Sequence, residues 1–472
     1  MMFPQWLLSP LFCALSLLFF APLLRGGDEE GAEQQVKTGF HLSDSALLNI
    51  HFSLASEYDT NINQVSEKSS FADNRNPARN YTYTDTMDLI LRLSPGLRAK
   101  IDDKSKTLAM GLLVTYNLYT GIEDKRTFDN YSNLSSLHFD TNLLGEFNKD
   151  GNVIVQASNN LKRHSRPDQI SIENGLHTNL FEDFLLSLYI KNTEDTLGLK
   201  IASGIQTNYF EEPAFSKHNF WNSRNTLYGQ WKFFPKTAVF FNASFIYQDY
   251  YNAGDYRDAQ RSMPLSVFAG ALGQVTPKIS LRLSGGYTNS FSHDMHHDGV
   301  AGLEFVFKQS QNTLLRLGYI RSLMPVPVFQ YYVLDKVYAN VTQKFFNRLL
   351  LKFDANYSHY AYGKNVRYPT LDNRNNPETV TNPATGTTKT LTTTQKSIDR
   401  EDHVVKIEPA VSYNFLPWLG LSLQYTFETR QTPYWSAQRV ATTGGTISSD
   451  VTYTTHYDYF DHRILFVLTA DY

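Results

Sequence analysis

Hydrophobic and polar residues alternate with period two along most of the chain. From Leu349 to Tyr357 the odd positions are hydrophobic, whereas Lys352, Asp354 and Asn356 between them are polar. Successive side chains of a strand point to opposite faces, so this pattern predicts a half-buried β-strand rather than a helix. The same alternation recurs in the segments 279–291, 405–415 and 419–427.

The connections between the expected strands fall into two alternating sets. The short set lies at 102–105, 149–151, 191–195, 234–236, 276–277, 309–312, 345–347 and 416–417. The other set lies at 64–80, 123–130, 211–217, 252–260, 292–298, 363–401 and 431–449, with two short members near 165–168 and 324–327. Counting turns predicts about eighteen strands of roughly 13 to 18 residues, longer than the strands of soluble sheets. Turn placement between 170 and 210 leaves this count open by one hairpin.

Composition favours a membrane barrel over a helical membrane protein or several soluble domains. Aromatic residues make up 14% of the 472 residues and gather near strand ends, while mean hydropathy is only −0.36. We therefore expect an all-β chain with one closed antiparallel transmembrane β-barrel over residues 46–472. Short periplasmic turns and longer extracellular loops would join its strands. Closure follows because an open sheet edge in lipid leaves backbone N–H and C=O groups unpaired.

The N-terminus predicts export to the bacterial outer membrane. The apolar run from Trp6 to Leu24 indicates a secretory signal peptide over residues 1–27, cleaved before a polar periplasmic tail over 28–45. No Lys or Arg precedes the run and no small-x-small cleavage site follows it, so a retained anchor helix is the alternative. Cys13 is the single cysteine and lies in this run, so the mature chain has no thiolate ligand or haem-attachment site. We expect no cofactor.

Charge and motifs narrow the partners. The chain has 43 basic and 46 acidic residues without a basic stripe, which disfavours nucleic acid as a partner. No nucleophile motif such as G-x-S-x-G occurs, and we expect no enzyme. Outer-membrane lipid and the barrel-assembly machinery are the expected partners. The final strand resembles the C-terminal assembly signal of outer-membrane barrels through its alternate residues Phe466, Leu468, Ala470 and Tyr472.

The polar faces of the expected strands supply candidate lumen-lining residues. These are Asp88, Arg92, Arg282, Glu304, Arg316, Lys352, Asp354, Lys406 and Glu408. Mixed charges of this kind either form a selectivity lining or make paired networks that keep the wall solvated.

Two loops carry further candidates. His293, His296 and His297 offer imidazole ligands for a metal, but an exposed polar loop between two strands is the favoured interpretation, because their spacing matches no metal motif. Loop 363–401, rich in Thr, Asn and Pro, either folds inward to constrict a pore, binds a partner at the surface, or stays disordered.

Turn and wall motifs carry a family resemblance. They are Tyr58-Asp59-Thr60-Asn61, Leu93 to Leu97, Asn225 to Gly229, Trp231 to Thr237, Gly270 to Gly273, Thr276-Pro277-Lys278 and Gly285-Gly286-Tyr287. They resemble the β-barrel porins often encoded beside exopolysaccharide gene clusters, over most of residues 46–472 and most clearly over 215–325. The resemblance implies a porin fold without catalytic residues, and polysaccharide export assisted by periplasmic export proteins.

Three functions follow as hypotheses. A passive channel for polar solutes or a polysaccharide chain is the first, because about eighteen strands enclose an aqueous lumen. A non-conducting surface structural or adhesive barrel is the second. The third is the barrel sheath of an electron conduit, which would need separate haem proteins.

Overall fold

The computed structural model describes the barrel strands and most of their connections. The described residues are 39–61, 70–73, 81–82, 87–120, 137–166, 177–211, 218–251, 261–292, 295–326, 330–363, 377–381, 388–395, 400–432, 435–443, 450–456 and 458–472. Residues 1–38, where the signal peptide is expected, lie outside them. Across the ranges described, no helix is long and apolar enough to cross a membrane.

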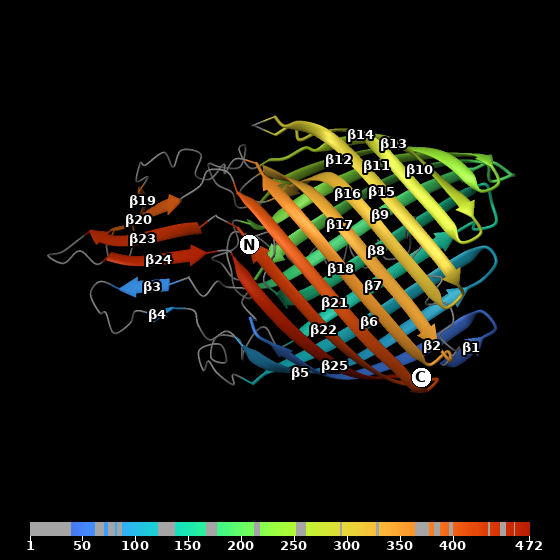
Figure 1. Cartoon of the computed structure of the whole chain (residues 1–472), viewed down its shortest axis with the longest axis horizontal. Coiled ribbons are helices and arrows are strands. Elements are labelled where there is room, and N and C mark those ends of the chain that lie inside the picture. Colours follow the sequence, from blue (N-terminus) through green and yellow to red (C-terminus); the bar gives the residue numbers. More distant parts are fainter. Residues whose placement is uncertain are drawn as a thin grey trace, which may run out of the picture.

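Eighteen antiparallel strands form one closed barrel (Figure 1). In order around the wall they are β2 (Ala46–Asp59), β5 (Asp88–Asp102), β6 (Lys106–Tyr119), β7 (Leu137–Phe147), β8 (Val153–Arg166), β9 (His177–Lys191), β10 (Leu197–Phe210), β11 (Phe220–Phe234), β12 (Thr237–Tyr250), β13 (Leu265–Thr276), β14 (Ile279–Asn289), β15 (His297–Ser310), β16 (Thr313–Val326), β17 (Gln330–Phe345), β18 (Leu349–Tyr362), β21 (Glu401–Leu416), β22 (Leu419–Gln431) and β25 (Tyr459–Asp471). The predicted all-β closed barrel and its strand number are confirmed.

The first and last barrel strands close the seam. β25 pairs with β2 from Asp59↔Arg463 to His51↔Asp471, and Tyr472 exchanges two backbone hydrogen bonds with Ile50. Below this point β1 (Phe40–Ser43), inside the segment expected as a tail, pairs with the start of β2. Strand pairing thus covers the edge of β2 along its length, and both described chain ends lie where the short turns are.

The eight predicted short turns are confirmed and mark one end of the barrel, called the turn end here. The opposite end, called the loop end, carries the longer connections, except for the predicted short one near 324–327, where β16 ends at Val326 and β17 begins at Gln330. One predicted length is wrong, because β8 ends at Arg166 and β9 begins at His177. The sequence Pro167-Asp168 suggested a tight turn, whereas ten residues outside the described ranges join these two strands.

The outer face of the barrel is apolar and the inner face is polar. On β2, Ile50, Phe52 and Leu54 are about half exposed on the outside, while Ser53 and Glu57 point inward. On β18 the outward row from Leu349 to Tyr357 consists of aliphatic and aromatic side chains, and His359 is the first residue of this row outside that class. Ten residues span roughly 33 Å of strand, or about 25 Å of height at a tilt near 40°, which matches the apolar band of a transmembrane barrel.

Glycines in the wall make room for aromatic rings from the adjacent strand. Gly318 is paired with Tyr338, and a Cβ on Gly318 would lie 2.2 Å from the tyrosine ring. Gly270 faces Phe240 in the same way, with a ring atom 2.6 Å from the ideal Cβ. Each ring covers backbone that glycine leaves exposed, so the pair stabilises the register between its strands.

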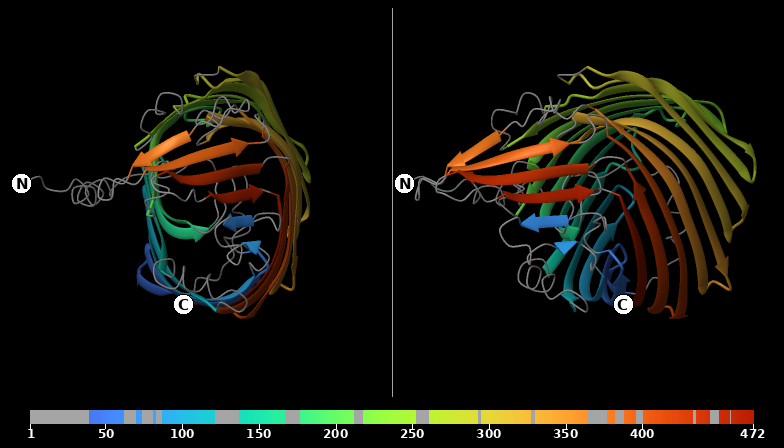
Figure 2. Two further views of the ribbon diagram at one scale, coloured as in Figure 1. Left: turned by 90° about the vertical axis from the view of Figure 1, so that its left-hand side faces the viewer. Right: turned by 60° about the vertical axis from the view of Figure 1, so that its left-hand side comes forward.

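A second sheet stands beyond the loop end and, viewed along the barrel, in front of its opening (Figure 2). Its order is β19 (Pro377–Thr381), β20 (Thr388–Gln395), β23 (Trp435–Thr443), β24 (Asp450–His456), β3 (Ser70–Asp73) and β4 (Tyr81–Thr82). We call it the outer sheet. Three connections at the loop end build it. Their strands follow one another in the outer sheet in the same order as the hairpins β18–β21, β22–β25 and β2–β5 follow one another around the barrel wall. Loop 363–401 contributes β19 and β20, which the sequence did not predict.

Candidate lumen lining

All nine predicted lumen residues lie on the inner face of the barrel. Strand register places Arg282 opposite Glu304, and Asp354 opposite Glu408, on the face opposite to the apolar rows. They divide by height into two groups. Asp88 and Arg92 lie near the loop end, and the other seven lie lower on the wall from β14 to β21. Whether they select what passes stays a prediction.

The mid-wall group comprises the seven lower residues together with Lys336 and Tyr338. Tyr338 donates a hydrogen bond to Glu304 at 2.8 Å, and Lys406 pairs with Glu408 at 2.9 Å. The guanidinium of Arg282 lies 4.7 Å from the centre of the Phe240 ring. Two of these contacts reach across an intervening strand, from β17 to β15 and from β14 to β12, and the third lies within β21, so the side chains are held against the wall.

A pocket of about 240 Å³ opens within this group and is lined by Glu304, Arg316, Lys336 and Tyr338 among others. Five bases (Arg282, Arg316, Lys336, Lys352, Lys406) and three acids (Glu304, Asp354, Glu408) give the group a formal charge of +2. Arg282 and Lys352 are exposed, so the basic excess faces solvent. The sequence-based list of lumen residues did not include Lys336 and Tyr338. Both have even numbers in 330–345, and even-numbered residues such as Lys352 in the next strand face the lumen.

The rim group lies at the loop end of the inner wall, on β2, β5, β21, β22 and β25. Its charged members are Glu57, Asp59, Asp88, Arg92, Arg400, Asp402, Glu428, Arg430, Asp461 and Arg463. Arg463 contacts Glu428 at 3.0 Å and Asp461 at 2.9 Å, and Arg92 pairs with Glu57. Tyr459 donates to Glu428 at 2.5 Å.

Arg400 anchors the β21 side of the rim group. Its guanidinium donates to both carboxylate oxygens of Asp402, at 3.0 and 2.7 Å, and lies 4.7 Å from the ring centre of Tyr362. Both charged side chains are fully buried. Burial in this form requires pairing, since an uncompensated charge in a poorly solvated site costs several kcal/mol.

Burial separates the two interpretations offered for the lumen charges. Six carboxylates and four guanidiniums give the rim group a formal charge of −2, but Asp402 and Glu428 have no exposed surface and contact arginine. The rim group therefore has the character of a paired network. The mid-wall group keeps solvent contact and a basic excess, and this makes it the better candidate for a selectivity lining.

The predicted histidine loop is only partly described. His293 lies outside the described residues. His296 stacks on Tyr331 with ring centres 4.9 Å apart, and His297 is exposed in register with Asn289. Within the ranges described, a group of three metal-ligand side chains occurs elsewhere, at His359, Glu401 and His403.

The C-terminal residues occupy the outer face of β25. Phe466 and Leu468 are exposed there, and Tyr472 packs edge-on against Phe40 with ring centres 5.1 Å apart. Ala470 lies opposite Phe52 of β2. Their alternation supports closure of the seam, and their role as an assembly signal stays a prediction.

Comparison with known proteins adds little beyond architecture. No family model and no curated protein matches the sequence. Solved structures with similarity include the siderophore receptor PirA from Acinetobacter baumannii, at 8% identity over 90% of this chain and 80% of that chain, with a TM-score of 0.41. OccAB4 from Acinetobacter baumannii shows 12% identity over 90% and 98% of the chains, with a TM-score of 0.40. OpdO from Pseudomonas aeruginosa shows 10% identity over 90% and 97%, with a TM-score of 0.40.

Proposed function

We propose that the chain is a bacterial outer-membrane channel through which polar solutes pass along the barrel axis. The observation that carries this proposal is the closed wall of eighteen strands with an apolar outer face and a charged inner face. Lipid requires the closed wall, because every backbone polar group must be satisfied within it. The charged inner face suits an aqueous lumen, and barrels of this strand number are wide enough to hold such a lumen.

The position of the membrane follows from the outward side chains. Aromatic residues including Trp231, Phe346 and Trp418 are exposed toward the turn end. Tyr357, Tyr425 and outward histidines mark the loop end. Such girdles flank the apolar band of outer-membrane barrels. We infer that the turn end is periplasmic and that the loop end and outer sheet face the outside.

The cargo proposal is a polar, uncharged or anionic solute, and export of a polysaccharide chain is its most specific form. The basic excess of the mid-wall group supports an anionic preference, since exposed Arg282 and Lys352 attract negative charge into the lumen. Polysaccharide export rests on the family resemblance and would involve periplasmic export proteins as partners. We propose no enzymatic role for the barrel.

Single-channel conductance tests the proposal. The full chain, exported in a bacterial host and purified from its outer membrane, is inserted into a planar bilayer. A second protein has residues 377–395 replaced by a short Gly–Ser linker. Ohmic steps from the full chain would support an open channel, and steps only from the shortened protein would support one blocked by the outer sheet. Silence from both, with β-structure confirmed by circular dichroism, would refute conduction.

The outer sheet favours a second candidate function, display of a binding surface outside the cell. Its six strands come from three separate connections, which is more structure than a simple loop needs. Binding of cell-surface glycans to whole cells that express either protein would test this. Equal binding by the shortened protein would exclude the part of the outer sheet formed by β19 and β20.

A further inference from the structure

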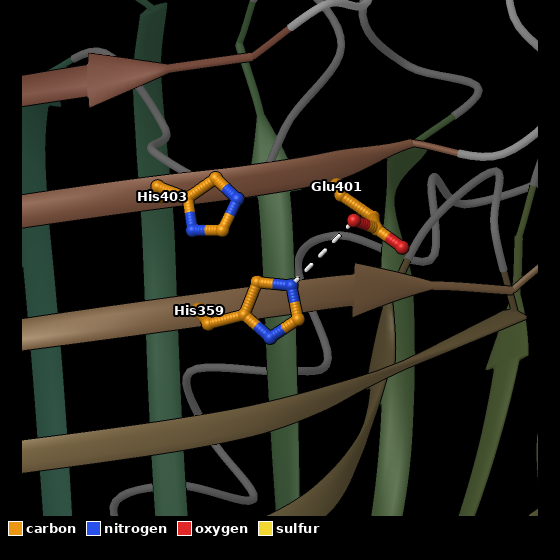
Figure 3. Close-up of side chains that lie close together, drawn as sticks. All are labelled: His359, Glu401 and His403. Atoms are coloured by element: carbon orange, nitrogen blue, oxygen red, sulfur yellow. Dashed lines mark ion pairs between the residues drawn. The ribbon is translucent and has the colours of Figure 1, made fainter.

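Two histidines and a glutamate converge on the outside of the barrel at its loop end (Figure 3). His359 lies near the end of β18, and Glu401 and His403 lie at the start of β21. Strand register pairs His359 directly with His403, and their rings stack with centres 4.8 Å apart. The Nε2 atom of His359 is 3.8 Å from a Glu401 carboxylate oxygen. One ligand atom from each side chain lies within 4.8 Å of the others.

The opposite ring nitrogens of both histidines already have polar neighbours. The Nδ1 atom of His403 is 2.8 Å from the hydroxyl oxygen of Tyr357. The Nδ1 atom of His359 lies 4.0 Å from a carboxylate oxygen of Asp335. Metal-binding histidines commonly donate their remaining N–H to a carboxylate or another acceptor, which fixes the tautomer with the metal on the other nitrogen. Both Nε2 atoms are therefore the ones left to bind an ion.

Asp335 is itself held in place from a third strand. Arg321 on β16 donates to both of its carboxylate oxygens, at 2.9 and 2.7 Å, and Tyr319 donates to one of them at 2.6 Å. Arg321 also contacts Asp298 at 2.5 Å. The carboxylate beside His359 thus has a fixed position and a compensated charge. The site therefore combines three ligand side chains with a tyrosine hydroxyl in hydrogen-bond contact with His403 and an anchored carboxylate 4.0 Å from His359.

We propose that His359, Glu401 and His403 form a binding site for a divalent transition-metal ion, with Zn²⁺ as the representative ion. Two imidazoles and one carboxylate suit zinc, nickel, copper or ferrous ions, whereas magnesium and calcium prefer oxygen ligands alone. Bonds of about 2.1 Å place tetrahedral ligand atoms roughly 3.4 Å apart, so the three side chains must close slightly. Glu401, with 59% of its side chain exposed, has room to do so. Water would complete the coordination.

The site lies where the chain leaves and re-enters the barrel wall. β18 ends and β21 begins beside it, and the segment between them supplies β19 and β20 of the outer sheet. A bound ion would join the two ends of that segment. The site is independent of whether the barrel conducts, because its ligands face outward and none belongs to the mid-wall or rim group.

Metal titration tests the proposal on the full chain, purified without a histidine tag and freed of metal. Competition with a chromophoric zinc chelator is expected to show one Zn²⁺ per chain. His403→Gln and Glu401→Gln should weaken binding at least tenfold, and Asp335→Asn about tenfold, as is usual for residues that support a ligand. His462→Gln is the matched control, because His462 is also outward and contacts a tyrosine, Tyr425, at 2.8 Å. It should bind zinc like the wild type.

A spectroscopic variant keeps the test decisive if a glutamine variant fails to fold. His359→Cys loaded with Co²⁺ should show a thiolate-to-cobalt charge-transfer band, absent from wild type and from His462→Cys. No zinc binding by the wild type would overturn the site. So would equal binding by His403→Gln and Glu401→Gln, an equal loss in His462→Gln, or no charge-transfer band in folded His359→Cys.

Discussion

Loss of Arg463 should strongly destabilise the loop end of the barrel. Its guanidinium contacts the carboxylates of Glu428 and Asp461, which are 0% and 1% exposed, and it is itself 17% exposed. At 3.0 Å and an effective dielectric constant near 20, the attraction to Glu428 is about 5.5 kcal/mol before desolvation is subtracted. Removing one partner of a buried pair typically costs about 3–5 kcal/mol, because a buried charge loses its compensation.

A double-mutant cycle measures this interaction. Arg463→Met keeps much of the aliphatic stem, and Glu428→Gln keeps an acceptor for the Tyr459 hydroxyl. We expect the arginine variant to lower the free energy of unfolding by about 3–5 kcal/mol, with a coupling of about 1.5–3 kcal/mol to Glu428. The assay is equilibrium urea unfolding in lipid vesicles, followed by tryptophan fluorescence. A single-variant loss under about 1 kcal/mol with no measurable coupling would show a water-exposed pair and refute this reasoning.

Three further predictions concern the wall. The double variant Arg282→Gln/Lys352→Gln should lower the anion preference, measured as a reversal potential in a KCl gradient. The control Arg163→Gln, at an outward-facing residue, should leave it unchanged. Equal reversal potentials for the wild type, the double variant and the control would exclude the mid-wall group as the selective element. Phe353→Arg, on the outer face near the middle of the apolar row, should cost about 2–4 kcal/mol in the same unfolding assay. A cost below that of an inward Asn356→Arg would mean that this face does not contact lipid. Gly318→Val should displace the Tyr338 ring, weaken its bond to Glu304 and lower stability by about 1–3 kcal/mol, and the additional change Tyr338→Ala should relieve part of that loss.

The sequence predicted the wall well because the wall is a periodic structure. Outward Leu349, Phe353 and Tyr357 and inward Lys352 and Asp354 follow directly from alternation, and the short turns carry Pro, Gly, Asn and Asp signals. The outer sheet has no such signal. β20 reads Thr388-Lys-Thr-Leu-Thr-Thr-Thr-Gln395 and is almost uniformly polar, so neither face is marked by hydrophobicity.

The rim group and the histidine site depend on strand neighbours, which alternation does not give. Arg463 and Glu428 are 35 residues apart and meet because β22 and β25 are adjacent in the wall. The connection between these strands contains β23 and β24, which the sequence did not predict. His359 and His403 pair across a gap of more than forty residues in the same way. The alternation of residues therefore identifies the face on which a side chain lies. Its contact partners on other strands can be identified only from the three-dimensional structure.

The seam between β2 and β25 bears on the route that a solute would take through the proposed channel. β24 and β3 of the outer sheet pair across the same seam, through Val451↔Asp73 to Thr454↔Ser70. At the turn end, Tyr472 and Ile50 exchange backbone hydrogen bonds. The first and last strands are thus joined along the wall and again outside it. Sideways parting of the barrel into the bilayer would have to break both sets of pairing, so in the proposed channel a solute would move from mouth to mouth rather than leave sideways into lipid.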